Sequence, residues 1–215
     1  MNANTERRLL AGPAGQLEVA IDEPADAATH APAGLALICH PHPLHGGTLD
    51  NKVVQTLVRA FLPLGLRCVR LNYRGVGRSE GQWAQGPGEC DDAQAVLESF
   101  AQPGLPVVLA GFSFGGYVAA TLAQRLADQG QAPARLVMVG PATVNFPVPA
   151  VPPDSLVIHG EADDVVPLQA TLDWARPQSL PVVVIPGVGH FFHGQLPLLK
   201  SVVQRAFAPG PLLNS

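Results

Sequence analysis

The chain has 215 residues, enough for one domain with a full hydrophobic core and too few for two ordinary ones, so a single domain over residues 1–215 is predicted. Charged residues make up 14% and hydrophobic residues 47%, which disfavours disorder, and a net charge of −4 without a basic cluster beyond Arg7 and Arg8 disfavours nucleic acid as a partner. No apolar run approaches a membrane span and no signal peptide is evident, so a cytoplasmic protein without membrane contact is predicted.

The predicted elements alternate between strands and helices. A hairpin with strands at residues 7–10 and 16–21 opens the chain. Six more strands are expected at residues 35–40, 66–71, 106–110, 134–139, 155–159 and 181–185. Five helices are expected at residues 51–61, 91–101, 115–127, 168–175 and 195–208, with Asp91 as the N-cap of the second. Five strands are almost continuously apolar, which predicts an α/β fold: a mostly parallel sheet of about eight strands, flanked by helices, with the antiparallel hairpin at one edge.

The segment Gly111-Phe112-Ser113-Phe114-Gly115-Gly116 lies between a predicted strand and a predicted helix. Gly-x-Ser-x-Gly in that context is the pattern of a nucleophile elbow. The serine takes a strained conformation, and the flanking positions two residues before and after it must be glycine to avoid clashes. The helix start also supplies amide N–H groups that favour a developing oxyanion. Ser113 is therefore the candidate nucleophile; the alternative interpretation is an ordinary glycine-rich turn.

A serine nucleophile needs a base, and the base needs a carboxylate that orients it. Asp163 follows the predicted strand at residues 155–159, and His190 follows the strand at residues 181–185. The order Ser, Asp, His along the chain is the one found in α/β-hydrolases, and each residue comes at the carboxyl end of a strand, where open parallel sheets bind ligands. We therefore expect Asp163 and His190 to complete a triad, with Asp164 solvated or capping a helix and His193 as the alternative base.

These motifs together resemble the α/β-hydrolase superfamily, and within it a group of small, lidless bacterial serine hydrolases that look like esterases. The resemblance covers residues 35–207. It rests on Cys39-His-Pro-His-Pro-Leu-His-Gly-Gly47 with Asp50-Asn-Lys52, on Asn72-Tyr-Arg-Gly-Val-Gly-Arg-Ser-Glu-Gly81, and on the segments around Ser113, Asp163 and His190. In the superfamily, lids are inserted after the strand that ends at residue 139. The proline-rich stretch at residues 141–153 is too short to build one, so an open site with Phe146 at its rim is expected.

The resemblance also implies an oxyanion hole. One donor is expected to be the backbone N–H of Phe114, the residue after the nucleophile. The second is placed at His42, where relatives carry the donor of a His-Gly-x motif; the flanking Pro41 and Pro43 lack an N–H. The implied activity is hydrolysis of small carboxylic esters through an acyl-enzyme, with thioesters and amides as further candidates and Tyr117, Trp83, Phe146 and Phe191 as guesses at the pocket walls.

No cofactor is expected. The loop Gly75-Val-Gly77-Arg-Ser-Glu-Gly81 follows a strand, but its third glycine comes one residue too late for a dinucleotide fingerprint. Two other functions stay open. His40, His42 and His45 approximate a binuclear metal motif, with His159, His190 and His193 as further ligands, although Leu44 stands where that motif has aspartate. The chain could also be a non-catalytic binding protein with a hydrolase-like fold.

Overall fold

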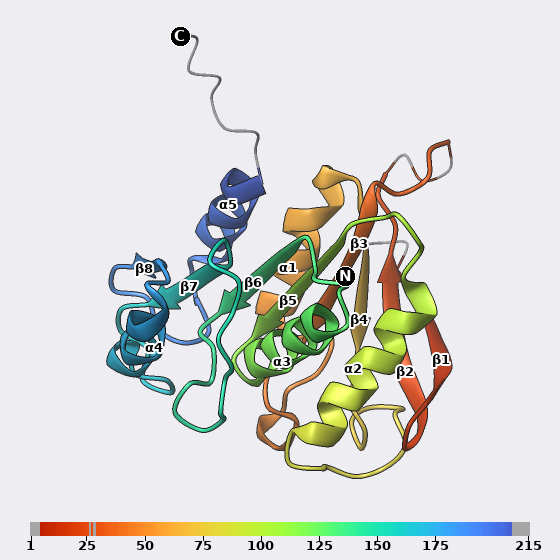
Figure 1. Ribbon diagram of the computed structural model, residues 1–215, viewed down its shortest axis with the longest axis horizontal. Helices are drawn as coiled ribbons and strands as arrows, with labels where there is room; N and C mark the ends of the chain where they lie inside the picture. The colour runs from red at the N-terminus through yellow and green to blue at the C-terminus, as the bar shows by residue number, and fades with distance from the viewer. Residues whose placement is uncertain (1–4, 26, 28, 208–215) are drawn as a thin grey trace, which may run out of the picture.

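The computed structural model describes residues 5–25, 27 and 29–207, and within them eight strands form one sheet in the order β1-β2-β4-β3-β5-β6-β7-β8 (Figure 1). The strands are β1 (Glu6–Gly12), β2 (Gly15–Asp22), β3 (Gly34–Cys39), β4 (Leu66–Leu71), β5 (Val107–Phe112), β6 (Arg135–Val139), β7 (Leu156–Gly160) and β8 (Val182–Ile185). From β4 to β8 every neighbouring pair is parallel, whereas β1 and β2 form the antiparallel hairpin at one edge. The predicted fold class is therefore confirmed.

The described residues also form five helices and three short 3₁₀ helices, of which all but the last helix lie between strands. The helices are α1 (Lys52–Phe61), α2 (Pro87–Phe100), α3 (Phe114–Asp128), α4 (Leu168–Ala175) and α5 (Leu196–Phe207). The 3₁₀ helices are η1 (Pro43–His45), η2 (Leu62–Leu64) and η3 (Arg176–Gln178). The fifth helix was expected to reach residue 208, which lies outside the described residues.

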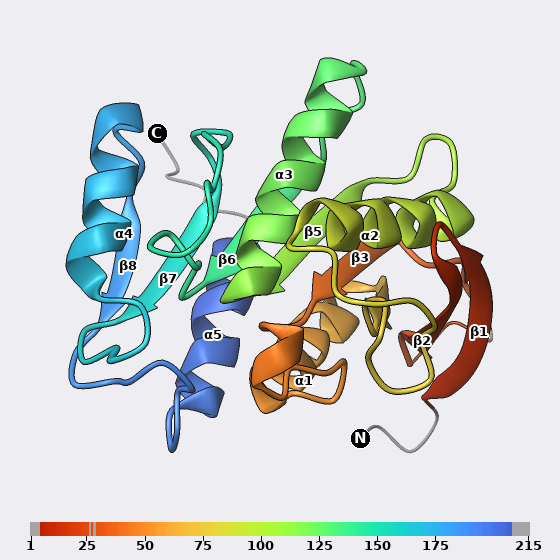
Figure 2. The same cartoon turned by 90° about the horizontal axis from the view of Figure 1, so that it is seen from below.

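Helices cover both faces of the sheet, as the apolar strands require. Figure 2 shows α2, α3 and α4 on one face and α1 and α5 on the other. Each face has its own buried core: Leu109 and Val118 belong to the core under α2 and α3, and Ala110 and Phe61 to the core under α1 and α5. Successive residues of β5 therefore alternate between the two cores, because side chains of a strand point alternately to opposite faces.

Helix α2 is where the sequence prediction was wrong. It begins at Pro87, four residues before the predicted start, and Asp91 is not its N-cap. Glu89 closes the helix start instead, because its buried carboxylate accepts hydrogen bonds from the N–H groups of Ala84 (2.9 Å) and Gly86 (2.7 Å). Asp91 lies on the exposed side and pairs with Arg125 at 2.8 Å. Proline at the first helical position and glutamate at the third were the signals that favour this start.

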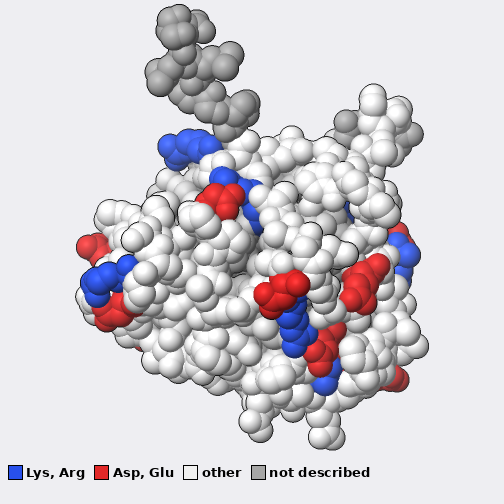
Figure 3. All heavy atoms as spheres, viewed as in Figure 1, with Lys and Arg blue, Asp and Glu red and all other residues white. Residues whose placement is uncertain are grey.

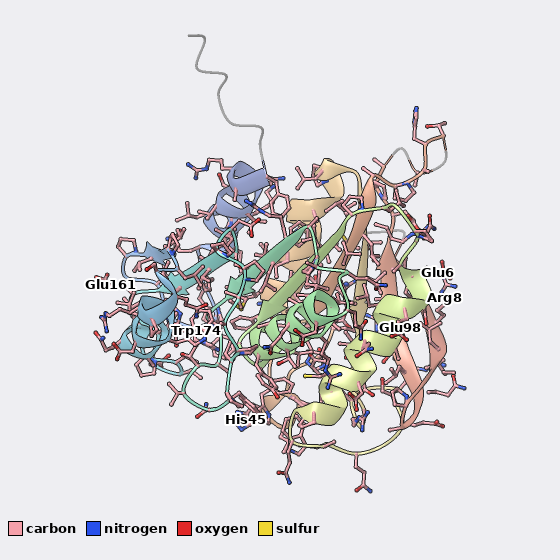
Figure 4. All side chains as sticks on the ribbon, in the orientation of Figure 1. Glu6, Arg8, His45, Glu98, Glu161 and Trp174 are labelled. Atoms are coloured by element: carbon pink, nitrogen blue, oxygen red, sulfur yellow. The ribbon has the colours of Figure 1, made fainter. Side chains whose placement is uncertain are left out.

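The segment between β6 and β7 contains no helix, so no lid covers the carboxyl edge of the sheet. Several hydrogen bonds fix this segment on α4 and the turn after it. The indole Nε1 of Trp174 donates to the carbonyl of Val148 at 3.0 Å, and the N–H of Val151 donates to Gln178 Oε1 at 3.0 Å. Figure 4 labels Trp174 on α4 beside this segment. The site at this edge is therefore open and bordered by an anchored loop.

The surface carries scattered charges of both signs. On the face seen in Figure 3, most acidic groups have a basic group beside them, with broad uncharged surface between. The ion pairs Arg125–Asp91 and Arg176–Asp173 are of this kind. Among the helices of the described residues, none combines the length and apolar character needed to cross a membrane.

Candidate active site

Ser113 occupies the sharp turn between β5 and α3. Its backbone has φ 55° and ψ −117°, a conformation that non-glycine residues rarely adopt and that marks stored strain. A Cβ at Gly111 would collide with the carbonyl of Gly115, and a Cβ at Gly115 would collide with the carbonyl of Cys39. The N–H of Ser113 donates to the Val139 carbonyl at 2.9 Å, which fixes the turn to β6. The elbow geometry predicted from the motif is thus present.

His190 and Asp163 meet at the same edge of the sheet. Asp163 follows β7 and His190 follows β8, and the Nδ1 of His190 donates to Asp163 Oδ2 at 2.7 Å. The other carboxylate oxygen accepts from the N–H groups of Val165 (3.0 Å) and Val166 (2.7 Å). Both side chains are buried, whereas Asp164 is exposed. The structure therefore pairs His190 with Asp163 and leaves the neighbouring His193 exposed.

The surroundings keep Asp163 ionised. Burial by itself raises the pKa of this carboxyl group, but the hydrogen bond from His190 and the amide donors of Val166 and Val165 outweigh it, so the pKa lies below its usual value. An ionised carboxylate fixes the proton of His190 on Nδ1 and leaves Nε2 free to accept a proton. This is the tautomer that a general base next to a serine requires.

Two residues beside this pair had no predicted part in the triad, although His159 was considered as a metal ligand. His159, at the end of β7, is fully buried; its Nε2 lies 2.9 Å from the Val166 carbonyl and 3.5 Å from Asp163 Oδ2, and its Nδ1 has no hydrogen-bond partner. Gly140 packs its backbone on the pair, because a Cβ there would lie 3.4 Å from Asp163 Oδ2 and from the His190 ring. Their places at the carboxyl ends of apolar strands, His159 within β7 and Gly140 directly after β6, were the available signals.

The two candidate oxyanion donors come from the elbow itself and from the loop after β3, and the rings of Phe114 and His42 lie 5.3 Å apart. Phe114 is the first residue of α3, where an N–H has no acceptor within the helix. The carbonyl of His42 accepts from the N–H groups of His45 (3.1 Å) and Gly47 (3.0 Å), which curls the loop after β3. In the part of the chain that the structure describes, no hydrogen bond occupies the N–H of His42 or of Phe114. These free N–H groups keep Phe114 and His42 as the candidate oxyanion donors.

The histidines of the rival metal motif do not point at a common centre. His40 is buried, with Nδ1 at 2.6 Å from the Pro41 carbonyl and Nε2 at 3.3 Å from the Tyr73 N–H. Burial lowers the pKa of His40 to about 3, so it is a neutral structural residue. His42 accepts from the Leu44 N–H through Nδ1 and stacks on the exposed His45, labelled in Figure 4. No group of three potential metal ligands occurs among residues 5–25, 27 and 29–207.

Aromatic rings flank Ser113 on both faces of the sheet. We call His42, Trp83, Phe114, Tyr117 and Phe146 the Phe114 cluster, since each ring has its centroid within 6 Å of the Phe114 ring. We call Phe112, His190, Phe191 and His193 the Phe112 cluster, in which the His190 ring lies 4.9 Å from Phe112 and 5.1 Å from Phe191. The predicted wall residues are thus divided between two clusters, with Tyr117 buried beneath Phe146 and Phe191 45% exposed.

Comparisons with known proteins agree with this fold. A family model described as "Thioesterase domain" matches residues 37–154. The crystal structure of a serine hydrolase without a lid from Xanthomonas campestris is 36% identical, with a TM-score of 0.86, and the match covers 96% of this chain and 94% of that one. A serine hydrolase homologue from Coxiella burnetii is 40% identical, with a TM-score of 0.80, and the match covers 94% and 97% of the two chains.

Two further relatives have no assigned function. A protein of unknown function from Agrobacterium tumefaciens is 28% identical, with a TM-score of 0.81, over 93% of this chain and 94% of that one. An uncharacterized protein of Rickettsia prowazekii is 38% identical over 117 residues, which are 53% of this chain, and the chain spans about half the length of that curated relative. On the strength of the Xanthomonas and Coxiella matches, the chain is a hydrolase that belongs to the α/β-hydrolase superfamily, among its lidless serine hydrolases.

Proposed function

We propose that the protein hydrolyses small carboxylic esters through an acyl-enzyme on Ser113. The observation that carries this proposal is the hydrogen bond between His190 and Asp163, at the same sheet edge as the strained elbow of Ser113. An ionised aspartate, a histidine held in one tautomer and a serine at a helix start form the set that nucleophilic acyl transfer needs.

In the proposed reaction, Nε2 of His190 takes the proton of the Ser113 hydroxyl as its oxygen attacks the ester carbonyl. The N–H groups of Phe114 and His42 stabilise the tetrahedral oxyanion, and each such donor typically lowers the barrier by about 3 kcal/mol. His190 then gives its proton to the leaving alcohol, which departs as the carbonyl re-forms. Water attacks the acyl-enzyme with the same proton transfers and releases the acid and free Ser113.

The open site favours small or extended substrates. No lid encloses the carboxyl edge, so nothing in the described residues would shield a long lipid chain from water on all sides. The matched family model adds thioesters as a second substrate class, because attack at a thioester carbonyl uses the same residues with a thiolate as leaving group. We propose a small-molecule ester as the partner and the cytoplasm as the location, where the three free, buried cysteines would stay reduced.

The proposal is tested by measuring the turnover of short-chain methyl esters and thioesters by the wild-type protein and by the variants Ser113→Ala and His190→Ala. Wild type should hydrolyse them, and Ser113→Ala and His190→Ala should each lose at least about 1000-fold in kcat, since the triad acts as a unit. Circular dichroism and thermal melting check that the variants stay folded. Retention of more than a few per cent of the rate by both folded variants would disprove the triad, and loss of activity on chelation would favour a metal-dependent hydrolase.

A further inference from the structure

The two aromatic clusters differ in which half of the substrate they can contact. Phe112 and Phe114 flank Ser113 in the sequence and belong to the cores on opposite faces of the sheet. His190 lies in the Phe112 cluster, at 4.9 Å from the Phe112 ring. Both candidate oxyanion donors, His42 and Phe114, lie in the Phe114 cluster, with their rings 5.3 Å apart. The nucleophile therefore lies between the ring of the base and the rings of the oxyanion donors.

The geometry of the reaction then indicates which half of the ester faces each aromatic cluster. The base must lie next to the leaving oxygen, because it protonates that oxygen as the bond breaks. The alcohol half of the ester consequently extends toward the Phe112 cluster, where a cavity of about 430 Å³ is lined by His190, Phe191 and His193. The carbonyl oxygen points to the N–H groups of His42 and Phe114. The acyl substituent leaves the carbonyl carbon on the side away from the alcohol half, which is the side of the Phe114 cluster.

The Phe114 cluster is held in place before any substrate arrives. Phe114 and Tyr117 are buried and form its base, and the half-buried rings of Trp83 and Phe146 contact Phe114 at centroid distances of 5.3 and 4.8 Å. His42 contacts Trp83 at 4.6 Å. Rings that already contact one another in fixed geometry present a rigid surface, and little side-chain entropy is lost when a ligand binds there.

Each loop that carries a ring of this cluster is anchored separately. The Trp83 loop is fixed by Glu89, which accepts from the N–H groups of Ala84 and Gly86. The Phe146 segment is fixed by the bond from Trp174 to Val148, and the His42 loop by its own carbonyl. None of these bonds contributes to the triad. Three separately anchored loops therefore hold one set of rings in fixed positions beside the elbow.

We propose that the Phe114 cluster is the acyl-binding site, and that it selects acyl groups that carry an aromatic ring. A planar ring can stack on or meet edge-on the exposed parts of Trp83, Phe146 and His42, and aromatic pairs gain energy beyond the burial of apolar area. A straight alkyl chain gains only the area term. The preferred substrates are thus arylalkanoyl esters of small alcohols. This inference rests on the proposed function, since it assumes that Ser113 attacks an ester.

The test uses methyl esters, so that the leaving group is small and not aromatic. The kcat/KM for methyl 3-phenylpropanoate should exceed that for methyl 3-cyclohexylpropanoate, which has similar size but no aromatic face, by about two- to twelvefold. Methyl hexanoate should be poorer still. A second series, benzyl acetate against cyclohexylmethyl acetate, places the ring on the alcohol side and should show no such gain. Equal rates for the first pair, or a gain only in the second series, would overturn the proposal.

Variants locate the effect on the cluster. Trp83→Leu and Phe146→Leu should each lower the phenyl-to-cyclohexyl ratio toward one. Phe100→Leu is the matched control, because Phe100 is also a half-buried ring on this face but lies at the far end of α2, and its ratio should stay at the wild-type value. A wild-type ratio in both cluster variants would contradict the assignment.

The outcomes separate this inference from the proposed function. Covalent labelling of Ser113 by a small fluorophosphonate depends on the triad and not on the acyl site. Labelling together with equal rates for phenyl and cyclohexyl esters would refute the acyl site and leave the serine hydrolase intact. Absence of labelling on the folded protein would refute the proposed function itself.

Discussion

The strained backbone at Ser113 depends on Gly111 and Gly115, because close backbone contacts leave no room for a Cβ at either position. We predict that Gly115→Ala lowers the free energy of unfolding by at least about 2 kcal/mol, because the new Cβ would collide with the backbone of Cys39, which cannot rotate away. Gly189→Ala is the control: its φ is not positive and a Cβ there would meet only the Ala162 carbonyl, at 3.6 Å. Urea unfolding followed by fluorescence measures both, and equal stabilities would contradict the packing argument.

We predict that His159 positions Asp163. Its pKa is lowered by burial, so it stays neutral, with its proton on Nε2 facing the Val166 carbonyl and Asp163. We predict that His159→Leu lowers kcat by about two- to twelvefold, the effect of one hydrogen bond, while KM changes little. His159→Gln should restore most of the rate, because its amide can donate from a similar position and the unpartnered Nδ1 is not needed. Equal kcat in all three proteins would show that His159 is only a packing residue.

At the scale of elements, the start of α2 decides where the Trp83 loop lies. We predict that Glu89→Ala lowers the free energy of unfolding by about 1–3 kcal/mol, because the N–H groups of Ala84 and Gly86 lose a buried acceptor. Asp91→Ala, which removes the same type of charge two residues later, should change it by less than about 0.5 kcal/mol, since Asp91 makes only an exposed ion pair. A larger loss of unfolding free energy in Asp91→Ala than in Glu89→Ala, measured by urea denaturation, would show that Asp91 caps the helix.

The strands and most of the helices could be predicted because apolar runs and turn residues are local signals. The start of α2 was placed four residues late because Asp91 has the side chain of an N-cap, whereas Pro87 and Glu89 are the local signals of the start that the structure shows. Glu89 accepts from the N–H groups of Ala84 and Gly86. The contact of His159 with Asp163 also escaped prediction, although only three residues separate them. Whether a strand-end histidine points toward the next loop depends on the loop fold, which periodicity does not encode.

At the scale of the whole molecule, buried histidines predict how stability depends on pH. The pKa of His40 is about 3 in the folded protein and about 6.5 in the unfolded chain. Below pH 6.5 the unfolded chain therefore binds a proton that the folded protein does not, and stability falls as the pH decreases toward 3. The slope approaches 1.4 kcal/mol per pH unit for this residue alone.

Urea unfolding between pH 7 and pH 4.5 checks this dependence. In the variant His40→Gln, the pH slope of the free energy of unfolding should be smaller than in wild type by the contribution of about one proton, whatever the absolute stability of the variant. His159 and His42, whose pKa values burial also lowers, continue to contribute to the slope. Unchanged slopes would mean that His40 takes up a proton without unfolding, which its bonds to Pro41 and Tyr73 do not permit.

The whole molecule also shows how the sheet brings three separate segments to one edge. Ser113, Asp163 and His190 were predicted from their places after strands, and the parallel sheet brings the carboxyl ends of β5, β7 and β8 to one edge. The division of the surrounding rings into the Phe112 and Phe114 clusters could not be predicted, because it depends on which face of the sheet each loop crosses. The proposed chemistry was predicted from the order of the motifs, whereas the proposed acyl preference required the three-dimensional arrangement.

The most direct test of the central claim, an activated nucleophile at Ser113, is intact mass after incubation with a fluorophosphonate, followed by peptide mapping. A single adduct on Ser113, formed by wild type and absent in folded His190→Ala, is the predicted result. Folded wild-type protein that forms no adduct, or an adduct on another residue that does not depend on His190, would contradict the account.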